Sequence, residues 1–198
     1  MRVIVYVEGA SDKIAMQELL RDLIDRKAGQ GALIEFFETA AGDRKQTLLT
    51  KIPVRAVDIL ANDPTALVAV VPDLYPRNKA FPHETAQELA AGVLANFRSA
   101  FERKKVEDER VARRFRVFCF KHDLEALVLA AEDGLRSRLG ARSLKPTWTI
   151  PVEDQDHEQP PKHVVEQLFR DHNRRYVDTI DAPIILHAAS YQELAEKK

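Results

Sequence analysis

The first twelve residues constrain the fold more than any other part of the chain. Residues 1–7, MRVIVYV, have the β-branched content and the alternation typical of a strand, and this run stops at Glu8-Gly9. A helical pattern starts at Asp12. In open α/β folds a strand that turns directly into a helix places the intervening residues at the carboxyl edge of the sheet, where sites form. We therefore expect the carboxylates of Glu8 and Asp12 at that edge, and two acids there suggest a bound cation.

Apolar runs and helical patterns alternate along the first two thirds of the chain. Further strands are expected at 33–37, 66–71 and 115–120, and helices at 12–27, 46–60, 83–103 and about 122–131. The run at 66–71 is continuously apolar, which is typical of a strand covered on both faces. The pattern predicts an α/β fold with a mostly parallel central sheet and helices on both faces.

The last third is less regular. We expect a short strand at 148–150, an acidic loop at 153–161, a helix at 162–170, a strand at 183–186 and a final helix from Tyr191. The predicted domains are an α/β core at 1–135 and a C-terminal extension at 136–198 that packs on the core.

The charge balance excludes a strongly basic protein. Thirty Lys and Arg residues stand against 31 Asp and Glu residues, a net charge of −1, so any nucleic-acid contact must use a local patch. The densest basic stretch, 103–116, is interleaved with acids and is expected to be a solvated helix face with internal ion pairs.

The single cysteine, Cys119, excludes an internal disulfide and is expected in the core. With no signal-peptide pattern and no spanning apolar run, we expect a cytoplasmic chain without a membrane partner.

Asp73 follows the strand expected at 66–71, as Glu8 follows the first strand. Hard divalent cations such as Mg²⁺ or Mn²⁺ take oxygen ligands, and adjacent strand ends can bring one or two carboxylates together. Glu8, Asp12 and Asp73 are therefore candidate metal ligands. The alternative is that Asp12 is only a helix N-cap and that Glu8 and Asp73 are solvated strand-end acids.

A second candidate cluster lies in the strand-to-helix turn 121–125. His122 could donate to a phosphate or orient Glu125, and Lys121 could offset charge that develops in a transition state. The alternative is that Asp123 and Glu125 only cap the following helix.

The turn 42–45, Gly-Asp-Arg-Lys, is a further possible phosphate contact at a helix start. It lacks the spacing of a P-loop, and most such turns are only turns.

Four segments together resemble a known family. They are VEGASDK at 7–13, VVPDLYP at 70–76, KHDLEAL at 121–127 and QPPKHVVEQLF at 159–169. The set is similar to a domain-of-unknown-function family of small Toprim-like proteins, often encoded beside an ATPase of the ABC/SMC type in bacterial defence loci. The first two segments also resemble the Toprim domain of topoisomerases, primases and the overcoming-lysogenization-defect nucleases.

The resemblance implies a Toprim-like fold and a Mg²⁺- or Mn²⁺-dependent nuclease, or nuclease-like effector, that cleaves phosphodiester bonds in DNA or RNA. It implies a partner ATPase and a role in antiphage defence. Glu8 would be a metal ligand or general acid/base, and Asp12 and Asp73 would be metal ligands. Glu125 would be a fourth acid, with Lys121 and His122 beside it as catalytic residues.

One departure from the family pattern favours a different function. Toprim enzymes carry Asp-x-Asp at the second acidic motif, whereas this chain has Asp73-Leu74-Tyr75, and Tyr75 is a poor magnesium ligand. The alternative is therefore a non-catalytic Toprim-like binding or sensor subunit that docks on the partner ATPase.

Overall fold

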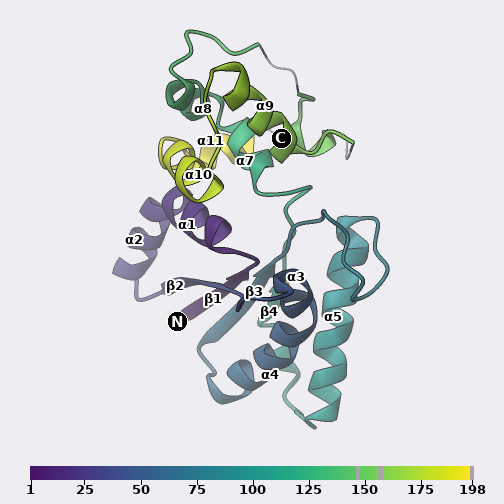
Figure 1. Ribbon diagram of the computed structural model, residues 1–198. Helices are drawn as coiled ribbons and strands as arrows, with labels where there is room; N and C mark the ends of the chain where they lie inside the picture. Colours follow the sequence, from purple (N-terminus) through teal and green to yellow (C-terminus); the bar gives the residue numbers. More distant parts are fainter. Residues whose placement is uncertain (146–147, 156–157, 197–198) are drawn as a thin grey trace. The chain divides into compact units, whose positions relative to one another are not determined.

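The computed structural model describes residues 1–145, 148–155 and 158–196. The chain forms two compact units (Figure 1). The first unit comprises Met1–Gly9 and Leu23–Cys119, and the second comprises Ala10–Asp22 and Phe120–Lys198. This grouping differs from the predicted division at residue 135, because α7, α8, α9 and α10, introduced below, share one hydrophobic core with the segment 10–22.

The first unit is built on a four-stranded parallel sheet. Its strands are β1 (Arg2–Val7), β2 (Leu33–Glu38), β3 (Ala66–Val71) and β4 (Phe115–Val117), in the order β2-β1-β3-β4. The predicted α/β class with a parallel sheet is confirmed. After β1 the chain adds β2 on one side, and after β2 it crosses to add β3 on the other side. The boundary between β1 and β3 is therefore the topological switch point of the sheet.

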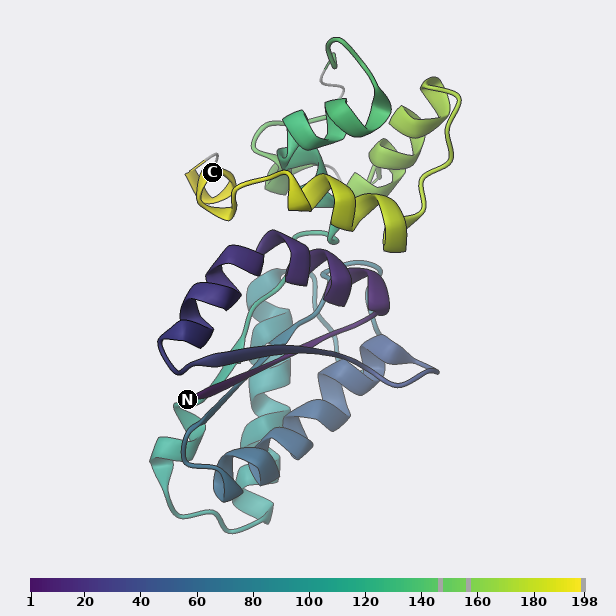
Figure 2. The ribbon, with the colours of Figure 1, turned by 90° about the vertical axis from the view of Figure 1, so that its left-hand side faces the viewer.

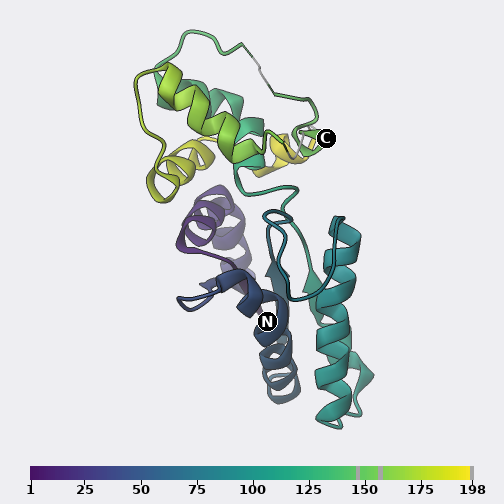
Figure 3. The ribbon, with the colours of Figure 1, turned by 45° about the vertical axis from the view of Figure 1, so that its right-hand side comes forward.

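Helices cover both faces of this sheet. They are α2 (Arg21–Gly29), α3 (Arg44–Gln46), the π-helical turn η1 (Thr47–Lys51), α4 (Ile52–Asn62), α5 (Ala86–Arg103) and α6 (Glu109–Ala112). Side chains from alternate positions of β1 and β3, such as Ile4 and Val68, share a core with α4 and α5, which pack side by side (Figure 3). On the opposite face, Val3 and Ile34 line a hollow together with Leu23 of α2.

Several boundaries differ from the sequence prediction. The helix expected at 12–27 is two helices, because a turn at Leu20 separates α1 (Ala10–Leu19) from α2. The helix expected at 83–103 is α5, and it begins at Ala86 because Thr85 and Glu88 form a capping box. The strand expected at 115–120 ends at Val117.

The second unit is helical. It contains α1, α7 (Glu125–Ala130), α8 (Glu132–Leu139), η2 (Val152–Asp154), α9 (Pro161–Asp171), α10 (Asp178–His187) and α11 (Tyr191–Glu196). Helix α1 packs along α10 (Figure 2), and Leu129, Leu135, Val165 and Ile185 are buried in their common core. Among the described residues, no helix combines the length and the apolar content that crossing a membrane requires.

The sequence prediction was least accurate in this unit. The strand expected at 183–186 is wrong, because this run lies within α10. The strand expected at 148–150 is absent from these described residues. The acidic loop expected at 153–161 begins inside η2, and its residues 156–157 lie outside the described part of the chain.

Candidate functional site

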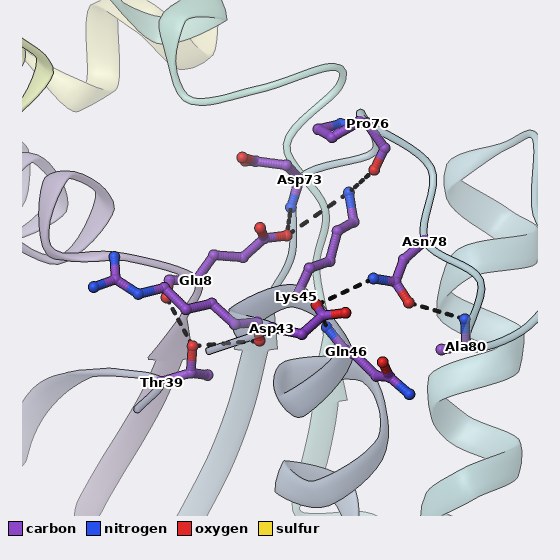
Figure 4. A network of polar contacts seen from close by, with 10 residues as sticks. Glu8, Thr39, Asp43, Lys45, Gln46, Asp73, Pro76, Asn78 and Ala80 are labelled. Carbon is purple, nitrogen blue, oxygen red and sulfur yellow. Dashed lines mark hydrogen bonds and ion pairs between the residues drawn. The ribbon is translucent and has the colours of Figure 1, made fainter. Parts of the chain in front are cut away.

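The ends of β1 and β3 bring Glu8 and Asp73 together (Figure 4). Val7 and Val71 are register partners, so the residues that follow them leave the same edge of the sheet. The backbone N–H of Asp73 donates to Glu8 Oε1 at 3.0 Å. The Glu8 side chain is 16% exposed, which leaves its carboxylate accessible but largely enclosed. Two of the predicted acids therefore lie in contact at the switch point of the sheet.

Lys45 of α3 completes this group. Its Nζ lies 3.8 Å from Glu8 Oε1 and donates to the carbonyl oxygen of Pro76 at 2.6 Å. The side chain is buried. Burial lowers the pKa of Lys45, and the negative charges of Glu8 and Asp73 oppose that shift without cancelling it. The site therefore holds a buried amine beside two carboxylates.

Loop contacts explain how Lys45 reaches this place. Thr39 Oγ1 donates to the carbonyl oxygens of Glu8, at 2.8 Å, and of Arg44, at 3.3 Å. Asp43 caps α3 by accepting from Gln46 N at 2.9 Å, and its Oδ1 also accepts from Asn78 Nδ2 at 3.4 Å. The loop after β2 is thus tied both to the end of β1 and to the loop after β3. The sequence prediction did not select Lys45, although the turn 42–45 was the signal that could have found it.

Two residues after Asp73, position 75 holds an aromatic side chain. The Arg77 guanidinium lies 5.7 Å from the centre of the Tyr75 ring, and hydrogen bonding to Tyr75 is the largest cause of the raised pKa of Arg77. Cys119 packs against the core of the first unit, as predicted. Burial raises the pKa of its thiol to about 12, so Cys119 is protonated at neutral pH and is a poor nucleophile.

The other predicted site residues belong to the second unit. Asp12 is buried in the first turn of α1, where Ser11 Oγ donates to its Oδ1 at 3.4 Å. It is not the N-cap, because α1 begins at Ala10. Lys121 Nζ pairs with Asp154 Oδ1 at 3.3 Å, and His122 is buried.

Glu125 is the most buried of the predicted acids in this unit. It accepts a hydrogen bond from Tyr176 OH at 3.2 Å, and Lys162 Nζ lies 3.9 Å from the same oxygen. Burial, and then the charge of Asp123, raise the pKa of Glu125 to about 7. Burial also raises the pKa of Asp123 to about 6. Glu125 can therefore hold or release a proton near neutral pH.

Lys162 links these acids to a third carboxylate. Its Nζ donates to Asp178 Oδ2 at 3.1 Å, and its backbone N–H donates to Asp123 Oδ2 at 3.4 Å. Burial lowers the pKa of Lys162, but Glu125 and Asp178 outweigh burial and the net shift is upward. Lys162 is therefore a stable cation among acids of the second unit.

The donor set of the first unit fits a hard divalent cation in part. Glu8 and Asp73 supply carboxylate oxygens, and Mg²⁺ commonly takes one or two such ligands with water or substrate phosphate in its other positions. Within residues 1–145, 148–155 and 158–196 no group of three or more His, Cys, Asp or Glu side chains is arranged to hold a metal.

Comparison with known proteins gives a family and distant structural similarities. A family model described as "Domain of unknown function (DUF4276)" matches residues 7–198. None of the curated proteins matches the chain. The C-terminal region of the Burkholderia pseudomallei OLD protein is similar at 15% identity and a TM-score of 0.46, covering 97% of this chain and 90% of that one. The corresponding region of the Xanthomonas campestris pv. campestris OLD protein, in its mercury-phased structure, is similar at 14% identity and a TM-score of 0.44, covering 98% and 93%.

Proposed function

We propose that this chain, which belongs to the DUF4276 family, is a Mg²⁺- or Mn²⁺-dependent nuclease or nuclease-like effector that acts on phosphodiester bonds of DNA or RNA. The observation that carries the proposal is the contact of Glu8 with Asp73 at the switch point of a parallel sheet. Open α/β folds bind their ligands there. The motifs at 7–13 and 70–76, which resemble the Toprim pattern, contain these two acids.

The residues of the first unit have distinct roles in this proposal. Glu8 is a metal ligand or general acid/base, and Asp73 is a metal ligand. The N–H of Asp73 donates to the Glu8 carboxylate and the ammonium of Lys45 lies beside it, and both contacts fix the orientation of that carboxylate. A bound divalent cation would polarise the phosphoryl group and offset its negative charge.

The remaining elements of the proposal rest on the sequence resemblance. Asp12 and Glu125 as further metal ligands, and Lys121 and His122 as catalytic residues, stay predictions. A nearby-encoded ABC/SMC-type ATPase as partner and a role in antiphage defence are proposed on the same ground.

Metal-dependent thermal stability tests the site directly. A ligand that binds only the folded state raises the melting temperature, and a concentration of 100 times Kd stabilises by about 2.7 kcal/mol. We expect Mg²⁺ or Mn²⁺ to raise the melting temperature of the wild type but not of Glu8→Gln or Asp73→Asn. Glu35→Gln is the matched control, because Glu35 is an acid of the same sheet that pairs with Arg2. An equal rise in all four proteins would place the metal site elsewhere.

Tyr75 favours a second candidate function. With an aromatic residue in place of the second acid, the fold could serve as a non-catalytic binding or sensor subunit that docks on the partner ATPase. The two functions differ in their response to metal. The sensor, whose altered second motif does not assemble a competent metal site, would show no metal-dependent rise in melting temperature and would cleave neither DNA nor RNA with the ATPase present.

A further inference from the structure

The site contains a buried lysine of its own. Lys45 is 7% exposed, so its ammonium is held inside the site rather than in solvent. The hydrogen bond to the Pro76 carbonyl fixes Nζ on the loop that follows Asp73, and Glu8 Oε1 lies 3.8 Å away. Removing a lysine from water is costly unless charges and hydrogen bonds compensate. Here the compensation comes from the same carboxylates that are the candidate metal ligands.

The charges of this group suit a single divalent cation. Glu8 and Asp73 contribute two negative charges and Lys45 contributes one positive charge. In two-metal phosphodiester sites, two cations stabilise the attacking and leaving oxygens from opposite sides. This chain has Tyr75, which carries no charge, where the Toprim pattern has a further acid. One carboxylate is thus replaced and one ammonium is present, and both differences disfavour a second divalent cation.

We propose that the Lys45 ammonium supplies the positive charge that a second divalent cation would otherwise supply, so that the site takes one divalent cation only. The inference rests on the proposed function, whose metal site it specifies. Lys45 acts through Glu8 and Asp73 as a charge-compensating residue. Because its charge repels a cation approaching Glu8, removal of that charge should strengthen metal binding, opposite to the effect of removing Glu8.

Mn²⁺ binding measured by calorimetry, with bound ions counted by electron paramagnetic resonance, tests this without reference to activity. We expect the wild type to bind one ion. Lys45→Gln, which loses the charge and retains an N–H donor for the Pro76 carbonyl, should bind that ion at least about tenfold more tightly. Lys45→Arg keeps the charge and should stay near the wild-type affinity. Lys51→Gln, at an exposed lysine six residues further on, is the matched control and should change nothing.

An added carboxylate at position 75 should then restore binding of a second divalent cation when the Lys45 charge is also removed. Tyr75→Asp restores the Asp-x-Asp pattern and is expected to tighten binding of the single ion. The double variant Tyr75→Asp/Lys45→Gln is expected to bind two ions, because it has the additional carboxylate and lacks the ammonium.

The possible failures are distinguishable. A wild type that binds two ions, or a folded Lys45→Gln that binds Mn²⁺ no more tightly than the wild type, would overturn the inference and leave the proposed function standing. A wild type that binds no ion would overturn the proposed function, and the inference with it. If Lys45→Gln does not fold, the number of Mn²⁺ ions bound by the wild type still decides whether the site takes one divalent cation or two.

Discussion

At the scale of single residues, Glu8 contributes both to the stability of the first unit and to its proposed chemistry. It accepts the N–H of Asp73 and lies beside the buried Lys45, so its removal takes away the acceptor of that N–H and a negative charge next to the ammonium. We expect Glu8→Ala to lower the free energy of unfolding by about 1–3 kcal/mol, and Glu8→Gln to cost less because its amide oxygen can still accept. Urea unfolding measures both, and equal losses in the two variants would contradict this account.

Glu125 gives the second unit a predicted pH dependence. Its pKa is raised from 4.5 to about 7, so folding takes up a proton between these values. The contribution of Glu125 to the free energy of unfolding is fully present below about pH 4.5. It declines as the pH rises toward 7, by on the order of 3 kcal/mol. Asp123, raised to about 6, acts in the same direction, whereas Lys162 and Tyr176 stay protonated throughout this range.

Chemical unfolding between pH 5 and pH 7.5, in the presence of a chelator, measures this dependence. Glu125→Gln is expected to flatten the decline, because its side chain cannot titrate. Glu166→Gln on α9 is the control and should retain the decline, since the Glu166 carboxylate is 41% exposed. An unchanged decline in Glu125→Gln would show that another group takes up the proton.

The residues of the site differ in how far the sequence could reveal them. Glu8 and Asp73 could be predicted together, because each follows a recognisable strand and parallel strands end at one edge of the sheet. For Lys45 the turn 42–45 gave a signal, but its place beside Glu8 could not be predicted, because that place depends on hydrogen bonds of Thr39 and Asp43 that join three loops. No local pattern encodes such contacts.

At the scale of elements, the strands of the first unit were predictable and α10 was not. Apolar runs bounded by polar residues marked β1, β2 and β3 almost to their ends. The run Pro-Ile-Ile-Leu at 183–186 has the β-branched content of a strand, yet it is helical. Asp181 favours the helix through one local and one tertiary contact: it accepts from Val177 N at 2.6 Å at the start of α10, and it pairs with Arg138 of α8.

Gly134 allows the close approach of α8 to α10. A Cβ at this position would lie 2.4 Å from the carbonyl oxygen of Ile185, so the two helices would have to separate. We expect Gly134→Ala to destabilise the second unit by about 1–3 kcal/mol, although alanine is intrinsically the better helix former.

The matched control is Gly29→Ala at the end of α2, where an added Cβ meets no atom within 4 Å. This change should be neutral or slightly stabilising. Hydrogen exchange at amides of α8 and α10 would localise the loss in Gly134→Ala. Unchanged protection there would contradict the assigned contact.

At the scale of the whole molecule, several residues of the densest basic stretch have structural partners. Arg114 donates to the carbonyl oxygens of Leu60, Asp63 and Ala66, which secures the end of α4 to the start of β3. Lys104 pairs with Asp58, and Arg110 pairs with Asp108 at 3.0 Å. Of these three cations only Arg110 makes the ion pair internal to the stretch that the sequence pattern predicted, whereas Lys104 pairs with an acid of α4 and Arg114 with backbone carbonyls. All three are engaged within the first unit, which makes them poorly suited to hold a phosphate backbone.

The net charge of −1 then predicts weak activity for the isolated chain. Nucleic-acid affinity depends mainly on cations that neutralise phosphates, and it falls steeply as salt rises. We expect the purified chain with Mg²⁺ or Mn²⁺ to cleave DNA or RNA weakly or not at all at physiological salt, and to gain activity when the neighbouring ATPase delivers the substrate. Cleavage assays with and without the ATPase measure this gain, and Glu8→Gln should abolish it. Efficient cleavage by the isolated chain under these conditions would instead establish an autonomous nuclease.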